Sequence, residues 1–265
     1  MIGQERLIEQ LKSYSYKSFP RSLMLVGPKG SGKHTLAEEI GNMLNLTITD
    51  ITDNLSLDTI ELINRQLSPY LYLIDMSKLN ERKQNIILKF IEEPTNNTHL
   101  ILLVDNKNKL LETITNRCVV YELAPYPRDV LRTFAETKDE QVINLMLQVC
   151  TTPGQIKTAS FFDIKGIFDL ASKLVNQIDK LTYAQVIEMV DLFNYKDEYD
   201  KFDIDIFFNT LRLLLVTFYK KYNEKRLLDM YYYTNDKLSI LKDQRVKKDI
   251  FMLNYFTGFY KRFRG

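Results

Sequence analysis

The chain has no tryptophan, two histidines and two cysteines among its 265 residues. Cys118 and Cys150 are too few for a disulfide framework or a four-cysteine zinc ribbon, and such low cysteine usage is typical of a reducing compartment. His34 and His99 are too isolated to form a metal site. Long apolar runs are also lacking, since none approaches the ~18 residues of a membrane span and residues 1–6 have no signal-peptide core. We therefore expect a cytoplasmic protein with no leader and no membrane partner.

An excess of charge of one sign is absent as well. The 36 Lys and Arg against 34 Asp and Glu give a formal net charge of +2, so bulk charge indicates neither nucleic acid nor membrane binding. Residues 210–265 are a local exception, with 13 basic and 5 acidic residues. Two interpretations of this basic tail stay open: contact with DNA, or the solvated face of helices that pack in an assembly. The aromatics at 231–233 and 251–263 are either base-stacking platforms or, as we expect, core and interface residues.

Up to about residue 125, short apolar runs alternate with amphipathic stretches, which is typical of an α/β domain with a buried parallel sheet. The sequence predicts strands at 22–26, 71–74, 100–104 and 119–123. It predicts helices at 5–14, 33–44, 57–66 and 80–93, with Asn80 as N-cap and Pro94 as stop. The proline-rich segment 124–127 indicates a domain exit, and the later pattern is helical, with interruptions at 153–154 and 194–202. We expect an α/β domain at 1–125, a helical lid at 126–175 and a helical C-terminal domain at 176–265.

A glycine-rich segment follows the first predicted strand and precedes a predicted helix: Gly27-Pro28-Lys29-Gly30-Ser31-Gly32-Lys33. In that setting the spacing Gly-x-x-x-x-Gly-Lys predicts a phosphate-binding loop. Its glycines let backbone N–H groups approach phosphate oxygens, the helix N-terminus adds positive potential, and Lys33 reaches the β- and γ-phosphates. ATP is therefore the expected cofactor. A glycine turn in which Lys33 merely begins a helix is the alternative.

The metal half of the predicted site departs from what MgATP hydrolysis requires. The position after the lysine is normally Ser or Thr, whose hydroxyl binds Mg²⁺, but here it is His34, with Thr35 about 100° further round the helix. The strand at 71–74 ends in Asp75, a candidate Mg²⁺ ligand, yet Met76 takes the place of the glutamate that polarises the attacking water. We expect a site that hydrolyses ATP weakly or not at all.

Further segments resemble one family. They are Ile2-Gly3-Gln4-Glu5, Asp75-Met76-Ser77-Lys78-Leu79, Leu88-Lys89-Phe90-Ile91-Glu92-Glu93-Pro94 and Thr115-Asn116-Arg117-Cys118. Together with the glycine-rich loop they resemble motifs of the AAA+ subunits of DNA polymerase clamp loaders over about residues 2–126, with Asn116 in place of the family's Ser. The resemblance implies an AAA+ P-loop domain with a parallel sheet flanked by helices, followed by an all-helical lid and an all-helical, collar-like C-terminal domain.

Within that family the chain is most similar to the delta-prime subunit of bacterial DNA polymerase III, because of its altered metal site. The resemblance implies a subunit with little ATP hydrolysis of its own that gives an arginine finger, Arg117, to the ATP site of a neighbour. It places Asp105 beside the nucleotide, where an acid departs from the family's Thr or Asn and repels phosphate, and Lys157 at a lid position that is usually Arg. It implies Arg82 and Lys83 as contacts to DNA phosphates. The implied partners are other AAA+ subunits in a hetero-oligomer, a sliding clamp and primer-template DNA.

Two other functions stay open. A self-sufficient AAA+ ATPase, such as a clamp-loader motor or a helicase loader, needs a competent Mg²⁺ site, and His34 and Met76 argue against one. A catalytically inactive DNA-binding or scaffold protein leaves Arg117 as an ordinary surface arginine and uses only the basic tail.

Overall fold

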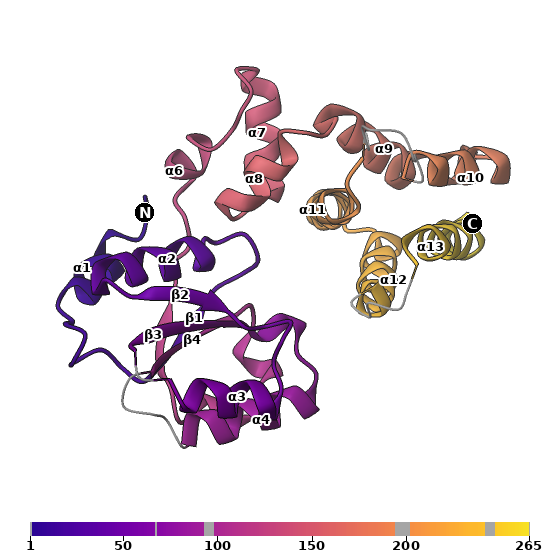
Figure 1. The fold of residues 1–265 in the computed structure, drawn as a ribbon. Coiled ribbons are helices and arrows are strands. Elements are labelled where there is room, and N and C mark those ends of the chain that lie inside the picture. Colours follow the sequence, from indigo (N-terminus) through magenta and orange to yellow (C-terminus); the bar gives the residue numbers. More distant parts are fainter. Residues whose placement is uncertain (1, 67, 93–97, 194–201, 242–246, 265) are drawn as a thin grey trace. The chain divides into compact units, whose positions relative to one another are not determined.

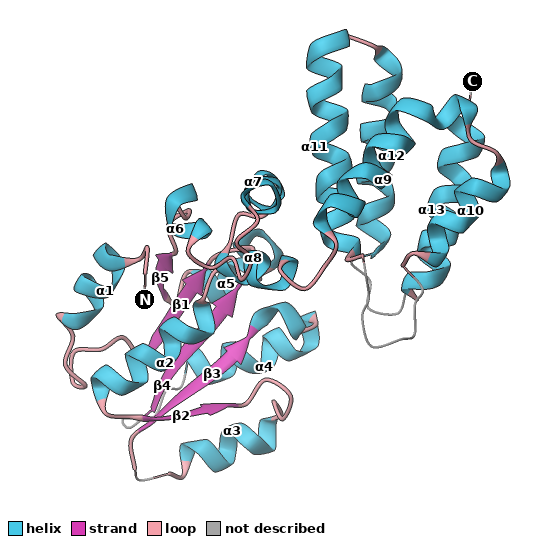
Figure 2. Cartoon of the chain, turned by 90° about the horizontal axis from the view of Figure 1, so that it is seen from above, coloured by secondary structure: helices cyan, strands magenta, loops and turns pink. Residues whose placement is uncertain are grey.

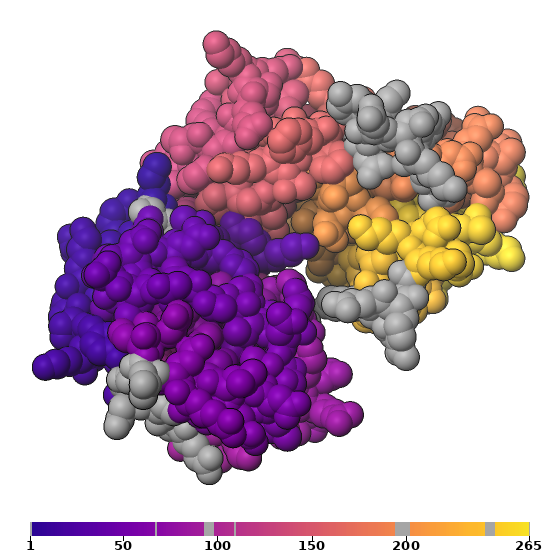
Figure 3. Space-filling view, in the orientation of Figure 1, coloured from indigo at the N-terminus to yellow at the C-terminus, as the bar shows by residue number. Residues whose placement is uncertain are grey.

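The computed structural model describes residues 2–66, 68–92, 98–193, 202–241 and 247–264 (Figure 1, Figure 3). The chain divides into two compact units, one formed by Met1–Val130 with Thr152–Gly154 and the other by Leu131–Thr151 with Gln155–Gly265. The separation of a lid from a C-terminal domain stays a prediction. The seam predicted at 194–202 lies, except for its last residue, outside the described residues.

The first unit is built on a five-stranded parallel sheet (Figure 2). The strand order is β2-β3-β4-β1-β5, and the strands are β1 (Ser22–Val26), β2 (Thr47–Asp50), β3 (Tyr70–Asp75), β4 (Thr98–Val104) and β5 (Val119–Glu122). The central strands β1 and β4 are buried at every position, as expected for strands covered on both faces. Since parallel strands end at the same edge of a sheet, the segments after β1, β3 and β4 come together there.

Helices cover both faces of the sheet (Figure 1). The helices on one face are α1 (Glu5–Lys12) and α2 (Lys33–Leu44), and those on the other are α3 (Leu57–Asn64), α4 (Glu81–Glu92) and α5 (Glu112–Thr115). Successive side chains of β1 point to opposite faces of the sheet, so this strand contributes to the hydrophobic core on each face. Leu23 and Leu25 pack with α1 and α2, whereas Met24 and Val26 pack with α3 and α4. The segment that follows β1 is therefore anchored from both sides.

The expected α/β fold is confirmed, although the strand β2 and the short helix α5 were not predicted and two helices are shorter than predicted. The edge strand β2 gives no apolar run because most of its residues are exposed. α1 and α3 end two residues before the predicted limits, since the amides of Tyr14 and Gln66 bond three residues back in tight turns. Asn80 caps α4 as predicted, and its Oδ1 accepts from the Lys83 amide at 3.0 Å. Pro94 lies outside the described residues.

The second unit is helical and has an aromatic core. Its helices are α7 (Glu140–Val149), α9 (Ile164–Gln177), α10 (Tyr183–Asp191), α11 (Ile204–Tyr222), α12 (Lys225–Leu241) and α13 (Lys248–Phe263), while α6 (Arg128–Arg132) and α8 (Pro153–Ala159) each contain a boundary between the units. Phe207, Phe208, Tyr255, Phe256 and Phe259 are at most 1% exposed. The aromatics of α13 thus form core, as we expect from the sequence. None of the helices in the described ranges is long and apolar enough to span a membrane.

His99 is a buried polar side chain in the first unit. It lies on β4, is 2% exposed, and meets the rings of Tyr16 and Phe19 edge to face, at centroid distances of 5.1 and 5.3 Å. Its Nδ1 donates to the carbonyl oxygen of Pro20 at 3.0 Å, and its Nε2 is without a hydrogen bond in the part of the chain that the structure describes. Burial lowers the pKa of His99, and the charge of Arg21 adds to this, whereas the bond to Pro20 opposes it.

Stability should therefore fall as this histidine is protonated. Because its pKa is lowered by folding, the unfolded chain binds more protons below a pH of about 6.5, and the midpoint of thermal unfolding should decrease from about pH 7.5 to about pH 5.5. We expect a smaller decrease for His99→Phe. His34→Gln, which removes the exposed histidine, should keep the full decrease. Equal decreases in all three proteins would show that His99 does not govern this pH dependence.

Candidate functional site

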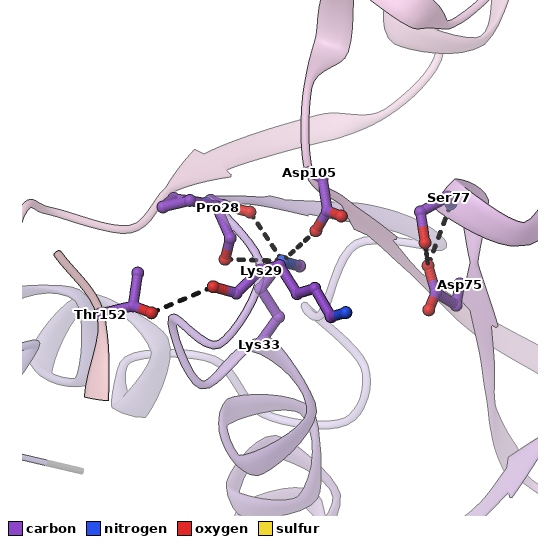
Figure 4. Close-up of polar contacts among 8 residues, drawn as sticks. Pro28, Lys29, Lys33, Asp75, Ser77, Asp105 and Thr152 are labelled. Carbon is purple, nitrogen blue, oxygen red and sulfur yellow. Dashed lines mark hydrogen bonds and ion pairs between the residues drawn. The ribbon is translucent and has the colours of Figure 1, made fainter. Parts of the chain in front are cut away.

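The glycine-rich segment forms a loop between the end of β1 and the start of α2 (Figure 4). The Gly27 amide donates to the Val104 carbonyl of β4 at 3.0 Å, which ties the loop to the centre of the sheet. Gly30 and Gly32 have φ angles of +80° and +89°, a left-handed conformation that glycine adopts without strain. The first amides of α2 have no acceptor within their own helix. The loop therefore has the backbone form of a phosphate-binding loop.

The carbonyl oxygens of this loop are all hydrogen-bonded within the chain. The six carbonyls at 27–32 accept at 2.6–3.1 Å, from Lys33 Nζ to Gly27 and Pro28, from Thr152 Oγ1 to Lys29, from the Gly154 amide to Gly30, from Tyr126 Oη to Ser31 and from the Leu36 amide to Gly32. The contacts of Tyr126 and Thr152 join residues that are 95 and 123 positions apart in the sequence. The loop is therefore held in shape by distant parts of the same unit.

Lys33 is buried and fully engaged. Its Nζ donates to the carbonyls of Gly27 and Pro28 and, at 2.7 Å, to Asp105 Oδ1 (Figure 4). An ammonium group has three N–H donors, so these three acceptors use all of them. Asp105 follows directly after β4, the neighbour of β1 in the sheet. The predicted phosphate ligand and the unexpected acid are thus the two halves of one ion pair.

The one candidate Mg²⁺ ligand, Asp75, has its contacts in the turn that follows β3. Asp75 Oδ1 accepts from the amide and the hydroxyl of Ser77, at 3.0 and 2.7 Å, and so caps the short 3-10 turn after β3 (Figure 4). Met76 is 3% exposed and packs in the core, while His34 and Thr35 are exposed on α2. Among the described residues, no three His, Cys, Asp or Glu side chains form a possible metal site. With its lysine engaged and no hydroxyl after that lysine, the site does not fit MgATP.

Arg117 lies just after α5 and is 42% exposed. Its Nη2 is 2.9 Å from Glu92 Oε1, and its Nη1 donates to the Thr113 carbonyl at 2.9 Å. These partners belong to α4 and α5 and not to the phosphate loop. The guanidinium is therefore held at the surface by two neighbouring helices.

The other predicted basic residues are spread over the chain. Arg82 and Lys83 lie in the first turn of α4, the first exposed and the second half-buried. Lys157 belongs to the helical unit, where its Nζ lies 5.7 Å from the centroid of the Phe134 ring. In the described ranges, no hydrogen bond or ion pair joins Arg82, Lys83 or Arg117 to the loop. The structure thus brings the loop residues 27–32, Lys33 and Asp105 together, whereas the contacts described for Asp75, Arg117 and Lys157 are with other residues.

Sequence reasoning missed two residues that support the loop. Thr152 carries no sequence signal, because its contact depends on the return of a distant segment. Tyr126 lies between two prolines in the segment interpreted only as a domain exit, and its ring packs so closely on Gly3 that a Cβ there would lie 2.9 Å from it. Gln4 exchanges hydrogen bonds of 2.8 and 2.9 Å with the backbone of Ala124, which fixes this segment. The sequence signal that could have identified Tyr126 is its position between two prolines, which restrict the backbone on either side of the ring.

Replacing Gly154 by alanine tests how tight the support is. A Cβ at this position would lie 2.7 Å from the Cα and 3.0 Å from the carbonyl oxygen of Gly30, which are backbone atoms with little freedom to move. Helix propensity alone favours alanine by about 0.5–1 kcal/mol, whereas crowding costs about 1–3 kcal/mol. We expect Gly154→Ala to lower the free energy of unfolding measured in urea, and Thr158→Ala, exposed on the same helix, to change it little. A stabilised Gly154→Ala protein would show that the contact is loose.

Comparisons with known proteins find similarity to subunits of DNA replication proteins. A family model described as DNA polymerase III, delta subunit, matches residues 47–127. The replication factor C small subunit of Methanothermobacter thermautotrophicus is 24% identical over 62% of this chain, and the match spans 63% of that protein's length. The corresponding subunit of Haloarcula marismortui is 23% identical over 52% of this chain and 49% of its own length. DNA polymerase III subunit delta' of Buchnera aphidicola is 36% identical over 20% of this chain and 16% of its own length. The chain thus spans less than two thirds of these curated relatives.

Two solved structures from Thermotoga maritima share the fold. A DNA polymerase III gamma subunit-related protein has a TM-score of 0.52 at 14% identity, over 98% of this chain and 100% of that one. The RuvB Holliday junction branch migration motor has a TM-score of 0.50 at 19% identity, over 84% and 78%. At these identities the likeness concerns the fold alone. In sequence, parts of this chain are thus similar to the replication factor C small subunit and to DNA polymerase III subunit delta'.

Proposed function

We propose that the chain is a clamp-loader subunit of delta-prime type. It assembles with other AAA+ subunits, gives Arg117 to the ATP site of a neighbour and helps to place a sliding clamp on primer-template DNA, with little or no ATP hydrolysis of its own. The observation that carries the proposal is a contrast: Arg117 is exposed and held by two helices, whereas Lys33 is buried and engaged by its own chain. The sequence matches to clamp-loader subunits support it.

The short helix α5 gives Arg117 a firm base. Ile114 of this helix is 0% exposed within the core of the first unit. Gln84 of α4 accepts a hydrogen bond from the Leu111 amide at 3.2 Å, which ties the start of α5 to α4. A guanidinium on such a packed element keeps its direction better than one on a free loop. Arg117 is therefore suited to enter a neighbouring site with a defined orientation.

The guanidinium can exchange its partners at little cost. Arg117 and Glu92 are 42% and 48% exposed, and exposed ion pairs contribute about 0–1 kcal/mol. A triphosphate in an adjoining subunit offers a stronger, charge-assisted acceptor. In that position Arg117 stabilises the negative charge that develops on the γ-phosphate during transfer.

Loss of this arginine should impair the neighbour and not this chain. In a complex assembled with the hydrolysing subunits that co-purify with the chain, and with only the adjoining ATP site left competent, Arg117→Ala should reduce DNA-stimulated phosphate release at least about 100-fold, because an arginine in this role is worth about 10³–10⁵ in rate. Arg65→Ala removes an exposed arginine at the end of α3 and should leave the rate unchanged.

Two results would contradict the proposal. Unchanged phosphate release by the Arg117→Ala complex would remove the arginine finger. Turnover by the isolated chain that is abolished in Lys33→Ala would identify a motor with its own active site.

We also propose Arg82 and Lys83 as contacts to DNA phosphates. They lie at the N-terminus of α4, where the helix dipole adds positive potential, and Arg82 is exposed. The double change Arg82→Ala with Lys83→Ala should weaken binding of a fluorescent primer-template. It should also reduce the slope of log affinity against log salt by about 1–2, since each neutralised phosphate contributes about 0.9. Lys220→Ala with Lys221→Ala, exposed at the end of α11, is the matched control. A larger loss in this control would assign DNA contact to the basic tail instead.

A further inference from the structure

The positive charge of Lys33 is balanced by a carboxylate of the same chain. Its side chain is 8% exposed, and its Nζ lies 2.7 Å from Asp105 Oδ1, on a carboxylate that is 37% exposed. A buried ammonium group is costly unless it is paired and hydrogen-bonded. In a phosphate-binding loop the pairing charge comes from the β- and γ-phosphates of the ligand. Here a carboxylate of the same polypeptide supplies it.

The backbone fixes Asp105 beside the loop. Its predecessor, Val104, is the last residue of β4 and pairs with Val26, the last residue of β1. The Val104 carbonyl also accepts from the Gly27 amide at 3.0 Å. The two central strands thus deliver the carboxylate to the lysine, and the pairing does not depend on a free loop.

A nucleoside triphosphate competes directly with this carboxylate. To reach Lys33 it has to break the ion pair and then lie beside a group of like charge, which opposes its binding. The lysine also gives up its bonds to the carbonyls of Gly27 and Pro28. A phosphate that binds Lys33 Nζ therefore has to replace the three hydrogen bonds that this atom already makes.

The shape of the loop does not require a ligand. Tyr126, Thr152 and Gly154 donate to three consecutive loop carbonyls at 2.8–3.0 Å, all from within the first unit. These bonds hold the part of the loop that Lys33 does not reach.

We propose that Asp105 determines the ligand specificity of this loop, because it serves as an internal anion for Lys33 and excludes nucleoside triphosphates. The loop then acts as a structural junction between the sheet, α2 and the segment at 152–154. The inference concerns this chain alone and is independent of Arg117, so that either can fail without the other.

The test is a calorimetric titration that measures the affinity of the full chain and of its Asp105→Asn variant. Each protein is titrated with ATP and Mg²⁺, and separately with inorganic triphosphate. Asparagine keeps the shape of the side chain and removes its charge. We expect Asp105→Asn to bind ATP at least about tenfold more tightly than the unaltered chain, a difference of about 1.4 kcal/mol. The gain should vanish when Lys33→Met is added. Asp53→Asn removes an exposed carboxylate from the same unit and should bind no better than the unaltered chain.

Without ligand, Asp105→Asn should unfold at a temperature about 3 °C lower, because Lys33 loses its counter-charge. If this variant does not fold, Asp105→Thr is titrated under the same criterion. A gain below tenfold in the folded variant overturns the proposal, whether both proteins bind equally or neither binds. A gain that persists after Lys33→Met also overturns it.

Discussion

The neutralisation of one buried ammonium group organises the first unit. Lys33 reaches Asp105 after β4 and the carbonyls of residues 27 and 28 after β1, so a single side chain of α2 links the two central strands. Tyr126 and Thr152 bond other carbonyls of the same loop. Any movement that opens the pair leaves a charge without a partner in a poorly solvated place, which is strongly unfavourable. Opening the pair is therefore opposed, and the loop stays bonded to β4, to Tyr126 and to Thr152.

The two prominent ion pairs of the first unit have opposite characters. The pair of Lys33 and Asp105 is largely buried on the lysine side, whereas Arg117 and Glu92 are both well exposed. Water and salt weaken the exposed pair, so its members can take other partners. The chain thus combines an internal contact that resists rearrangement with a surface contact that permits it. That combination suits the proposed role, in which a rigid first unit presents Arg117 to a neighbouring subunit.

Much of this fold was predictable, because a buried parallel strand has a strong sequence signature. The apolar runs that become β1 and β4 and the glycines of the loop were recognisable from residue type and spacing alone. β2 was not, because an exposed edge strand has no apolar run. The acid at Asp105 was recognisable as unusual, but its bond to Lys33 was not, since that bond joins residues 72 positions apart in the sequence and depends on how the sheet brings β1 and β4 together. Thr152 was beyond prediction for the same reason.

The position of β1 between β4 and β5 in the sheet also has a consequence for folding during synthesis. β1 ends at Val26, yet its neighbours are β4 and β5, and the second of these ends at Glu122. At a translation rate of ~5–20 residues per second, the apolar β1 run waits roughly 5–20 s before both of its sheet partners exist. Pairing of β1 with strands so far along the chain also closes long loops, and the entropy lost in closing them slows folding. During synthesis the apolar side chains of β1 therefore stay without their sheet partners until β4 and β5 have been made.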